Sequence, residues 1–318
     1  MSNTLNQRTA AVVDPILSTH ARGYRNLEFI APVLFPAVPV PNRSMKVLRF
    51  DKSAFRLVNT RRAPGAKKKR IQPGYGSDPI SLVQDALEGV VPEEYLEEAN
   101  SVPGIDLGQG AVEEVLDITG LGLEYDCAKM ARDAAGYSNS NKVALAGTDR
   151  WSSSLSDPEA DISDAKEVIR RSIGRYPNTL ALGPTSGAAL KRHAKIKEHF
   201  KYTGRESITE EMLAAFFDVK RVVIGKAVYL PETSGDEDPA LDVWGDDAIL
   251  AYVPEKGNNF RVPSYGYTYE LKGYPHIQKP YWDDSTDSWV YPAKFERRPY
   301  LVGPEGGFLF QNAGAAAA

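Results

Sequence analysis

The stretch that decides the fold is residues 178–229, NTLALGPTSGAALKRHAKIKEHFKYTGRESITEEMLAAFFDVKRVVIGKAVY. Its opening residues, TLAL, form a short apolar run before Gly-Pro and predict a buried strand that ends in a turn. Two helices are then predicted, over residues 186–200 and 209–217. The second has a good start signal, because Thr209 can cap it while Ile208 and Leu213 occupy the positions of a hydrophobic staple. The run RVVIGKAVYL closes the stretch as a second strand, so helices and strands mix here.

The segment before this stretch predicts two more helices. Residues 111–135 carry apolar side chains at helical spacing, interrupted only by two glycines, which predicts a long helix with a possible place for a kink. Residues 164–173 predict another helix, with Ser163 as its N-cap and Gly174 just past its end.

The C-terminal part of the chain is rich in strands. The candidates are residues 248–253, 264–272, 288–296 and 306–312. A turn at residues 281–287 joins two of these regions into a long hairpin. The chain as a whole is therefore predicted to be α+β.

A proline-spaced run, IAPVLFPAVPVP, covers residues 30–41. Each proline fixes its own φ and pushes the preceding residue towards extended geometry, so we expect neither a helix nor a membrane span here. The apolar side chains would be costly in water, at roughly 25 cal/mol per Å2. They need a partner surface in this subunit or in another one, and we assign Val33, Leu34 and Phe35 to contacts between subunits.

Two adjacent segments carry opposite charge. Residues 43–73, here called the basic loop, hold eleven Lys and Arg against one Asp, a balance of +10, and predict a long two-stranded excursion with its tip at RRAPGAKKK. Residues 78–133 hold fourteen acids against two bases, a balance of −12. Such blocks suit self-association, although two solvated faces of a monomer would give the same charges. The predicted contact between subunits joins Arg61, Arg62, Lys67, Lys68, Lys69 and Arg70 to Glu93, Glu94, Glu97 and Glu98.

Catalytic chemistry finds little support in the sequence. A phosphate loop and a nucleophile elbow are absent, and GPTSGA at residues 183–188 has its serine in the wrong place for the latter. His193 and His199 are six residues apart, which does not put them on one helix face. We therefore predict no catalytic residues, no cofactor and no metal, although the acidic run 236–247 could hold calcium without matching an EF-hand.

Composition limits the partners and the compartment. The net charge of −4 leaves no global basic field for nucleic acid, and KKKR lacks interleaved aromatic residues, so contact with DNA is non-specific at most. The single cysteine, Cys127, excludes an internal disulfide framework. Neither a membrane span nor a secretory signal is found, which predicts synthesis in a cytoplasm.

Taken together, the proline-rich arm, the long charged hairpin, the acidic helix, the mixed segment 178–229 and the second hairpin resemble the major capsid proteins of tailed double-stranded DNA bacteriophages. GPEGGFLFQNA near the C-terminus is also similar to that family. The resemblance implies the Hong Kong 97-type fold, divided into an N-terminal arm (1–42), an extended loop (43–91), a peripheral domain with a long spine helix (92–174 and 263–302) and an axial domain (175–262 and 303–318).

The resemblance also implies a function. Copies of the chain would assemble as pentamers and hexamers into an icosahedral phage head that encloses double-stranded DNA in the virion, built in the host bacterial cytoplasm. Its partners would be itself, a separate scaffolding protein, a portal and decoration proteins. The alternatives are an encapsulin-like nanocompartment shell and, from another class, a soluble β-rich binding or adhesion protein.

Overall fold

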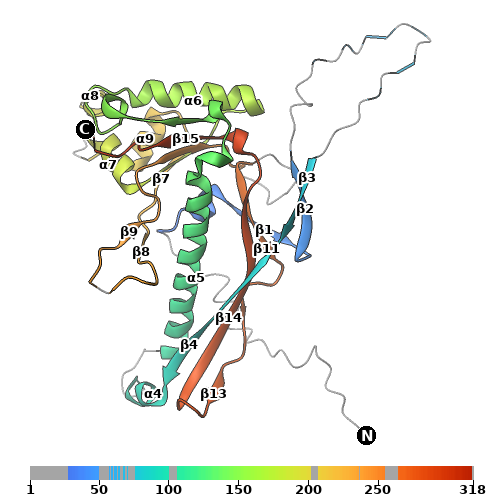
Figure 1. Ribbon diagram of the computed structural model, residues 1–318, viewed down its shortest axis with the longest axis vertical. Helices are drawn as coiled ribbons and strands as arrows, with labels where there is room; N and C mark the ends of the chain where they lie inside the picture. The colour runs from blue at the N-terminus through green and yellow to red at the C-terminus, as the bar shows by residue number, and fades with distance from the viewer. Residues whose placement is uncertain are drawn as a thin grey trace.

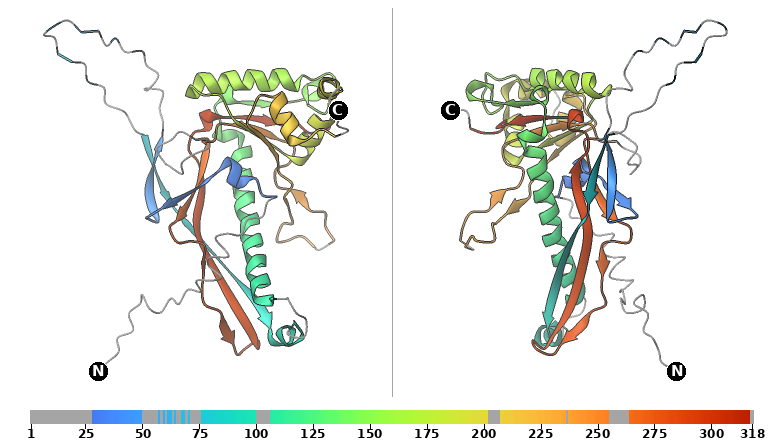
Figure 2. Two further views of the ribbon diagram at one scale, coloured as in Figure 1. Left: turned by 180° about the vertical axis from the view of Figure 1, so that it is seen from behind. Right: turned by 45° about the vertical axis from the view of Figure 1, so that its right-hand side comes forward.

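The computed structural model describes residues 28–49, 76–99, 106–201, 207–235, 237–254 and 264–316, and a few positions between 49 and 76. The molecule has two parts (Figure 1). One is an elongated sheet with the long helix α5 lying along it, and the other is a compact mixed layer of sheet and helices. A two-stranded ribbon and a smaller hairpin project from these parts on opposite edges (Figure 2).

The compact layer is built on a five-stranded sheet in the order β5-β15-β10-β6-β7. Its strands are β5 (Lys142–Ala144), β15 (Gly307–Gln311), β10 (Ala248–Ala251), β6 (Thr179–Leu182) and β7 (Arg221–Ile224). Every side chain of β6 and β10 is buried, which explains their continuous apolar sequence. The strands predicted at 178–182, 248–253 and 306–312 are confirmed.

Helices α6 (Pro158–Ile173), α7 (Pro184–Arg192), α8 (Ala194–Phe200) and α9 (Glu210–Phe216) complete this layer. The start of α9 is confirmed, since Thr209 accepts a hydrogen bond from Met212 N at 3.3 Å. The predicted N-cap of α6 is wrong. Asp157 caps it and Pro158 fills its first turn, which leaves Ser163 inside the helix. Gly174 does end α6, in the left-handed conformation at φ 71°.

Two predicted elements are each broken into two. The single helix expected over 186–200 bends at His193, whose extended backbone lets Leu190 of α7 and Ile196 of α8 both enter the core. The strand expected over 221–230 stops at Gly225 and resumes as β8 (Val228–Tyr229), which pairs with β9 (Leu241–Asp242). Trp244 packs against the chain at this break, and only glycine fits there, because a Cβ at Gly225 would lie 2.1 Å from the Trp244 ring.

The elongated sheet is centred on the long strand β14 (Ser288–Leu301). Its partners are β11 (Gly266–Leu271), β12 (His276–Ile277), β13 (Tyr281–Asp283) and β4 (Val83–Pro92). The predicted hairpin around residues 281–287 is confirmed, because β13 and β14 pair in antiparallel register. Strand β4 pairs with β14 along its whole length, from Val83 opposite Arg297 to Pro92 opposite Ser288. Residues 83–91 therefore belong to this sheet, which corrects the expected end of the projecting loop at 91.

Helix α5 (Leu107–Arg132) covers one face of the elongated sheet and confirms the long-helix prediction. Asp106 caps it by accepting from Gln109 N at 3.0 Å. The short helix α4 (Glu93–Ala99) joins β4 to the segment that leads into α5. One-turn 3-10 helices lie at Ala134–Gly136, Asn139–Asn141, Gly147–Asp149 and Pro304–Gly306.

The root of the basic loop is a ribbon of β2 (Ser44–Arg49) and β3 (Gly76–Ser81). Val47 and Ile80 anchor it against Tyr267 and Tyr269 of β11. Beyond the ribbon, the structure describes only scattered positions, all of them exposed. They are Leu57, Asn59, Arg61, Arg62, Pro64, Lys67, Lys68 and Arg70.

The N-terminal arm differs from its prediction in two respects, within the part from residue 28 onwards. Residues Ala31–Leu34 form a one-turn helix, α3, because Pro32 falls in its first turn, where a missing N–H costs nothing. The strand β1 (Ala37–Val40) follows and pairs in parallel with β11. Leu34 and Phe35 are only 0% and 1% exposed, inside this chain's own core. This corrects their assignment to a neighbouring subunit, whereas Val33 is only half-buried and its predicted role stays a prediction.

Candidate functional site

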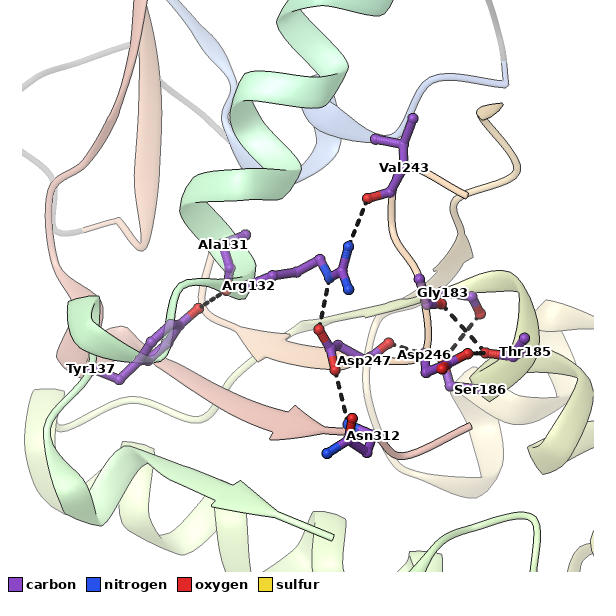
Figure 3. A network of polar contacts seen from close by, with 11 residues as sticks. Ala131, Arg132, Tyr137, Gly183, Thr185, Ser186, Val243, Asp246, Asp247 and Asn312 are labelled. Atoms are coloured by element: carbon purple, nitrogen blue, oxygen red, sulfur yellow. Dashed lines mark hydrogen bonds and ion pairs between the residues drawn. The ribbon is translucent and has the colours of Figure 1, made fainter. Parts of the chain in front are cut away.

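The end of α5 is tied to the compact layer by an ion pair between the half-buried Arg132 and the buried Asp247 (Figure 3). Arg132 donates from Nε to Asp247 Oδ2 at 2.7 Å and from Nη1 to the carbonyl of Val243 at 3.1 Å. The second carboxylate oxygen of Asp247 accepts from Asn312 N, just past β15, at 2.8 Å. Because both oxygens of a buried carboxylate are satisfied, one residue joins the helix to two strands of the sheet.

The turn GPTSGA completes this junction. Thr185 Oγ1 donates to Asp246 Oδ1 at 2.5 Å, and Ser186 Oγ donates to the carbonyl oxygens of Gly183 and Asp247 at 3.0 Å. Ser186 is fully buried and engaged with main chain. The motif that sequence reasoning compared with a nucleophile elbow therefore fixes the start of α7.

A second buried carboxylate fastens the N-terminal arm to α5. Glu124 is 1% exposed and accepts from Ile30 N at 2.9 Å, Ala31 N at 2.7 Å and Trp244 Nε1 at 2.6 Å. Burial raises the pKa of this carboxyl, and the three donors oppose that rise. The arm and the compact layer thus meet on one side chain of the spine helix.

A third group of charges lies at the root of the basic loop. Arg43 makes a two-pronged contact with Glu296, from Nε at 2.6 Å and from Nη2 at 2.7 Å, and Tyr274 donates to Glu296 at 2.9 Å. Glu296 is almost fully buried, and the Arg43 guanidinium holds the pKa of its carboxyl below the ordinary value of 4.5. This pair links the ribbon to β14.

A groove of about 870 Å3 runs between α5 and the β4–β14 sheet. Arg297 lies in it, donates to the carbonyl of Thr119, and stacks over the ring of Phe295 at 4.6 Å. Burial lowers the pKa of Arg297 and raises that of Asp126 across the groove. The lining side chains do not include a serine, cysteine or histidine that could act as a nucleophile or base.

The structure keeps the two predicted charge sets apart within one chain. Arg61, Arg62, Lys67, Lys68 and Arg70 are exposed on the basic loop, and Glu93, Glu94 and Glu97 are exposed on α4, at the far end of the elongated sheet (Figure 1). Lys69 and the side chain of Glu98 lie outside the described residues. A contact between these sets within one molecule is therefore not formed, and the proposed contact between molecules stays a prediction.

Sequence reasoning missed the charged side chains that hold the parts together. These residues lie far from their partners along the chain, so no local spacing in the sequence indicates the pairs. They are Glu124, Arg132, Asp247, Arg43 and Glu296. One signal was available for Glu124, since it stands three residues before Cys127 on the apolar stripe of its helix.

Metal ligands and membrane spans are also absent from the described part of the chain. Groups of three or more His, Cys, Asp or Glu placed to hold a metal ion do not occur there. Asp246 and Asp247, from the run considered for calcium, are engaged by Thr185 and Arg132. Over the same residues, none of the helices has the length and apolar character needed to cross a bilayer.

The family model for phage major capsid protein E matches residues 135–270. The major capsid protein of Burkholderia phage BcepMu is 36% identical over 306 residues, covering 95% of this chain and 96% of that protein. The crystal structure of a phage-related protein from Bordetella bronchiseptica RB50 is 47% identical, with a TM-score of 0.83, covering 97% of this chain and 99% of that one. The procapsid of satellite phage P4 gives a TM-score of 0.52 at 10% identity over 93% of this chain and 98% of that one.

A spine helix along a long sheet, a compact mixed layer and a projecting ribbon define a shell subunit of the Hong Kong 97-type fold, as the resemblance implied. Given the identity to the BcepMu protein over nearly its full length, the chain belongs to the phage major capsid proteins. It is a structural subunit of an icosahedral phage head and a component of the virion capsid.

The same fold also occurs in an encapsulin of Synechococcus elongatus PCC 7942, with a TM-score of 0.55 at 10% identity, covering 92% of this chain and 90% of that one. At that identity the likeness concerns the fold alone. The 36% identity to a phage capsid protein favours the phage head over the encapsulin-like alternative.

Proposed function

We propose that the chain forms pentamers and hexamers in which the basic loop of each copy lies over α4 of an adjacent copy. The observation that carries this proposal is the placement of the charges. Arg61, Arg62, Lys67 and Lys68 are exposed and follow the β2–β3 ribbon, which projects from the body, and α4 is the exposed acidic helix at the other end of the subunit. Exposed pairs contribute about 0–1 kcal/mol each, so their role is to set register while apolar burial supplies the affinity.

The partners follow from the same function. A separate scaffolding protein guides assembly in the host cytoplasm, a portal occupies one vertex, and decoration proteins bind the outer surface. The net charge of −4 supports contact with packaged double-stranded DNA that is non-specific at most. The role of the subunit is containment without catalysis.

The test reverses the charge of the loop tip with Lys67→Glu, Lys68→Glu and Lys69→Glu together. We expect the fraction of protein in closed shells, measured by sedimentation and negative-stain electron microscopy, to fall strongly. The matched control is Lys191→Glu, Lys197→Glu and Lys201→Glu on the compact layer, where the same change of charge falls outside the proposed contact. Normal shells with normal salt resistance from the loop variant would overturn the contact.

A further inference from the structure

The acidic run considered for calcium splits into two parts in the structure. Asp246 and Asp247 turn inwards, and the remaining acids belong to the acidic hairpin, residues 227–243, which is built on β8 and β9. This segment has five acids and no Lys or Arg, a charge of −5. Glu232, Glu237, Asp238 and Asp242 are exposed, and among the described residues none of them forms an ion pair.

Exposed apolar side chains lie beside these acids, on both faces of the ribbon. Val228, Leu230 and Leu241 are 49%, 46% and 46% exposed. The ribbon that carries them has two residues in each strand, and a two-stranded ribbon of that length is not stable in water by itself. A projecting element with exposed apolar side chains and one sign of charge is typical of a surface that another protein covers.

The base of the acidic hairpin is fixed by the rest of the chain. Val243 N donates to the carbonyl of Ala227 at 3.0 Å, and the ring of Tyr229 meets that of Tyr125 on α5 edge-on at 4.8 Å. The next residue, Trp244, is buried and donates to Glu124. The hairpin is therefore preformed, which lowers the entropy cost of docking on it.

We propose that the acidic hairpin receives the basic loop of a second copy of this chain. The charges are complementary, −5 against +10, and the fully exposed Leu57 of the loop is an apolar side chain that the exposed apolar residues of the hairpin could cover. The β2–β3 ribbon at the root of the loop and the acidic hairpin project from opposite edges of the molecule (Figures 1 and 2), so the proposed contact is between copies. A contact between unlike edges that repeats from copy to copy is the kind that closes into a ring.

The reach of the loop permits this contact. Arg61 stands twelve residues past Arg49, the end of β2, so an extended chain can carry it up to about 40 Å from the ribbon. The inference rests on the proposed loop function and adds a second acidic surface, nearer the compact layer, to the one on α4.

The test is covalent capture with a short bis-maleimide in the full chain. Leu57→Cys is combined with Leu241→Cys, and the only native thiol, Cys127, is fully buried and leaves little background. We expect a ladder of crosslinked oligomers, since each copy would be joined to two neighbours. Leu57→Cys with Leu155→Cys is the matched control, because Leu155 is 76% exposed but lies away from the hairpin. The pair Leu57→Cys with Tyr95→Cys tests, in the same way, the proposed contact of the basic loop with α4.

The outcomes separate this inference from the proposed function. The cysteine pairs are named here by their positions, so that 57/241 stands for Leu57→Cys with Leu241→Cys. A ladder of oligomers with the 57/241 pair and none with the 57/155 pair supports the hairpin contact. A 57/95 ladder without a 57/241 ladder overturns the hairpin contact, while the loop contact on α4 and the shell function stand. If neither 57/241 nor 57/95 gives a product, both loop contacts fail.

A charge reversal covers the case in which the cysteine variants fold poorly. Glu237→Lys with Asp238→Lys leaves the acids of α4 unchanged, so any loss of assembly reports on the hairpin alone, and we expect the fraction of protein in closed shells to fall strongly. A wild-type fraction of closed shells from this variant would overturn the inference.

Discussion

Glu124 shows how much of this subunit depends on one side chain. Replacing it by Gln keeps the size but presents an amide N–H to backbone donors that need an acceptor. We expect Glu124→Gln to lower the free energy of unfolding by about 2 kcal/mol, and Glu124→Leu, which leaves all three donors unpaired, to cost more. Urea unfolding of the unassembled subunit measures both, and Glu114→Gln, exposed on the same helix, is the control. Equal free energies of unfolding for the wild-type protein, Glu124→Gln and Glu124→Leu would contradict this role of Glu124.

Glu296 predicts a pH dependence of stability. Its pKa is lowered in the folded state by Arg43, so its contribution is fully present above the ordinary pKa of 4.5 and is lost as the pH falls through the folded value. We expect the difference in unfolding free energy between the wild-type protein and Glu296→Gln to be constant from pH 7 to about pH 5 and to shrink below it. Urea titrations at a series of pH values measure this, and a difference that does not change with pH would contradict it.

At the scale of the elements, two glycines on the same chain should respond in opposite directions. A Cβ at Gly225 would meet the Trp244 ring, so Gly225→Ala should destabilise the protein by about 1–3 kcal/mol. A Cβ at Gly122, inside α5, meets nothing within 4 Å, so Gly122→Ala should stabilise it by about 0.5–1 kcal/mol. Thermal unfolding compares the two variants, and a shift of the same sign in both would contradict this account.

The elements also show where sequence patterns stop being informative. The buried strand β6, the helix α9 and the long helix α5 were predictable, because apolar spacing and a capping threonine are local signals. The breaks at His193 and Gly225 were not, because distant side chains that fill the core impose them. The burial of Phe35 beside Gly266 has the same origin, since the run IAPVLF looks identical whether its own subunit or a neighbour covers it.

At the scale of the whole molecule, high salt should slow the assembly of shells but should not dissolve finished shells. The charges on the basic loop and its acidic partners are exposed, and screening shortens their range from about 10 Å at 0.1 M to about 3 Å at 1 M salt. We expect high salt to slow assembly in light scattering, because it weakens steering between copies. Shells formed beforehand should remain closed, since apolar burial holds them. Dissolution of finished shells by salt alone would show that charge supplies the affinity as well.

The parallel run of α5 and β14 has a mechanical consequence. Helix α5 has 26 residues and is therefore about 39 Å long. Its first half is packed against β14 through Val112, Val115 and Leu116, and its C-terminal end is fixed by the ion pair of Arg132 with Asp247. Such a strut resists bending, whereas the basic loop and the acidic hairpin are attached through short ribbons. In a closed shell, copies of the same chain lie at positions of slightly different curvature. We therefore expect the conformational differences between copies to occur in the basic loop and the acidic hairpin, while α5 keeps its shape.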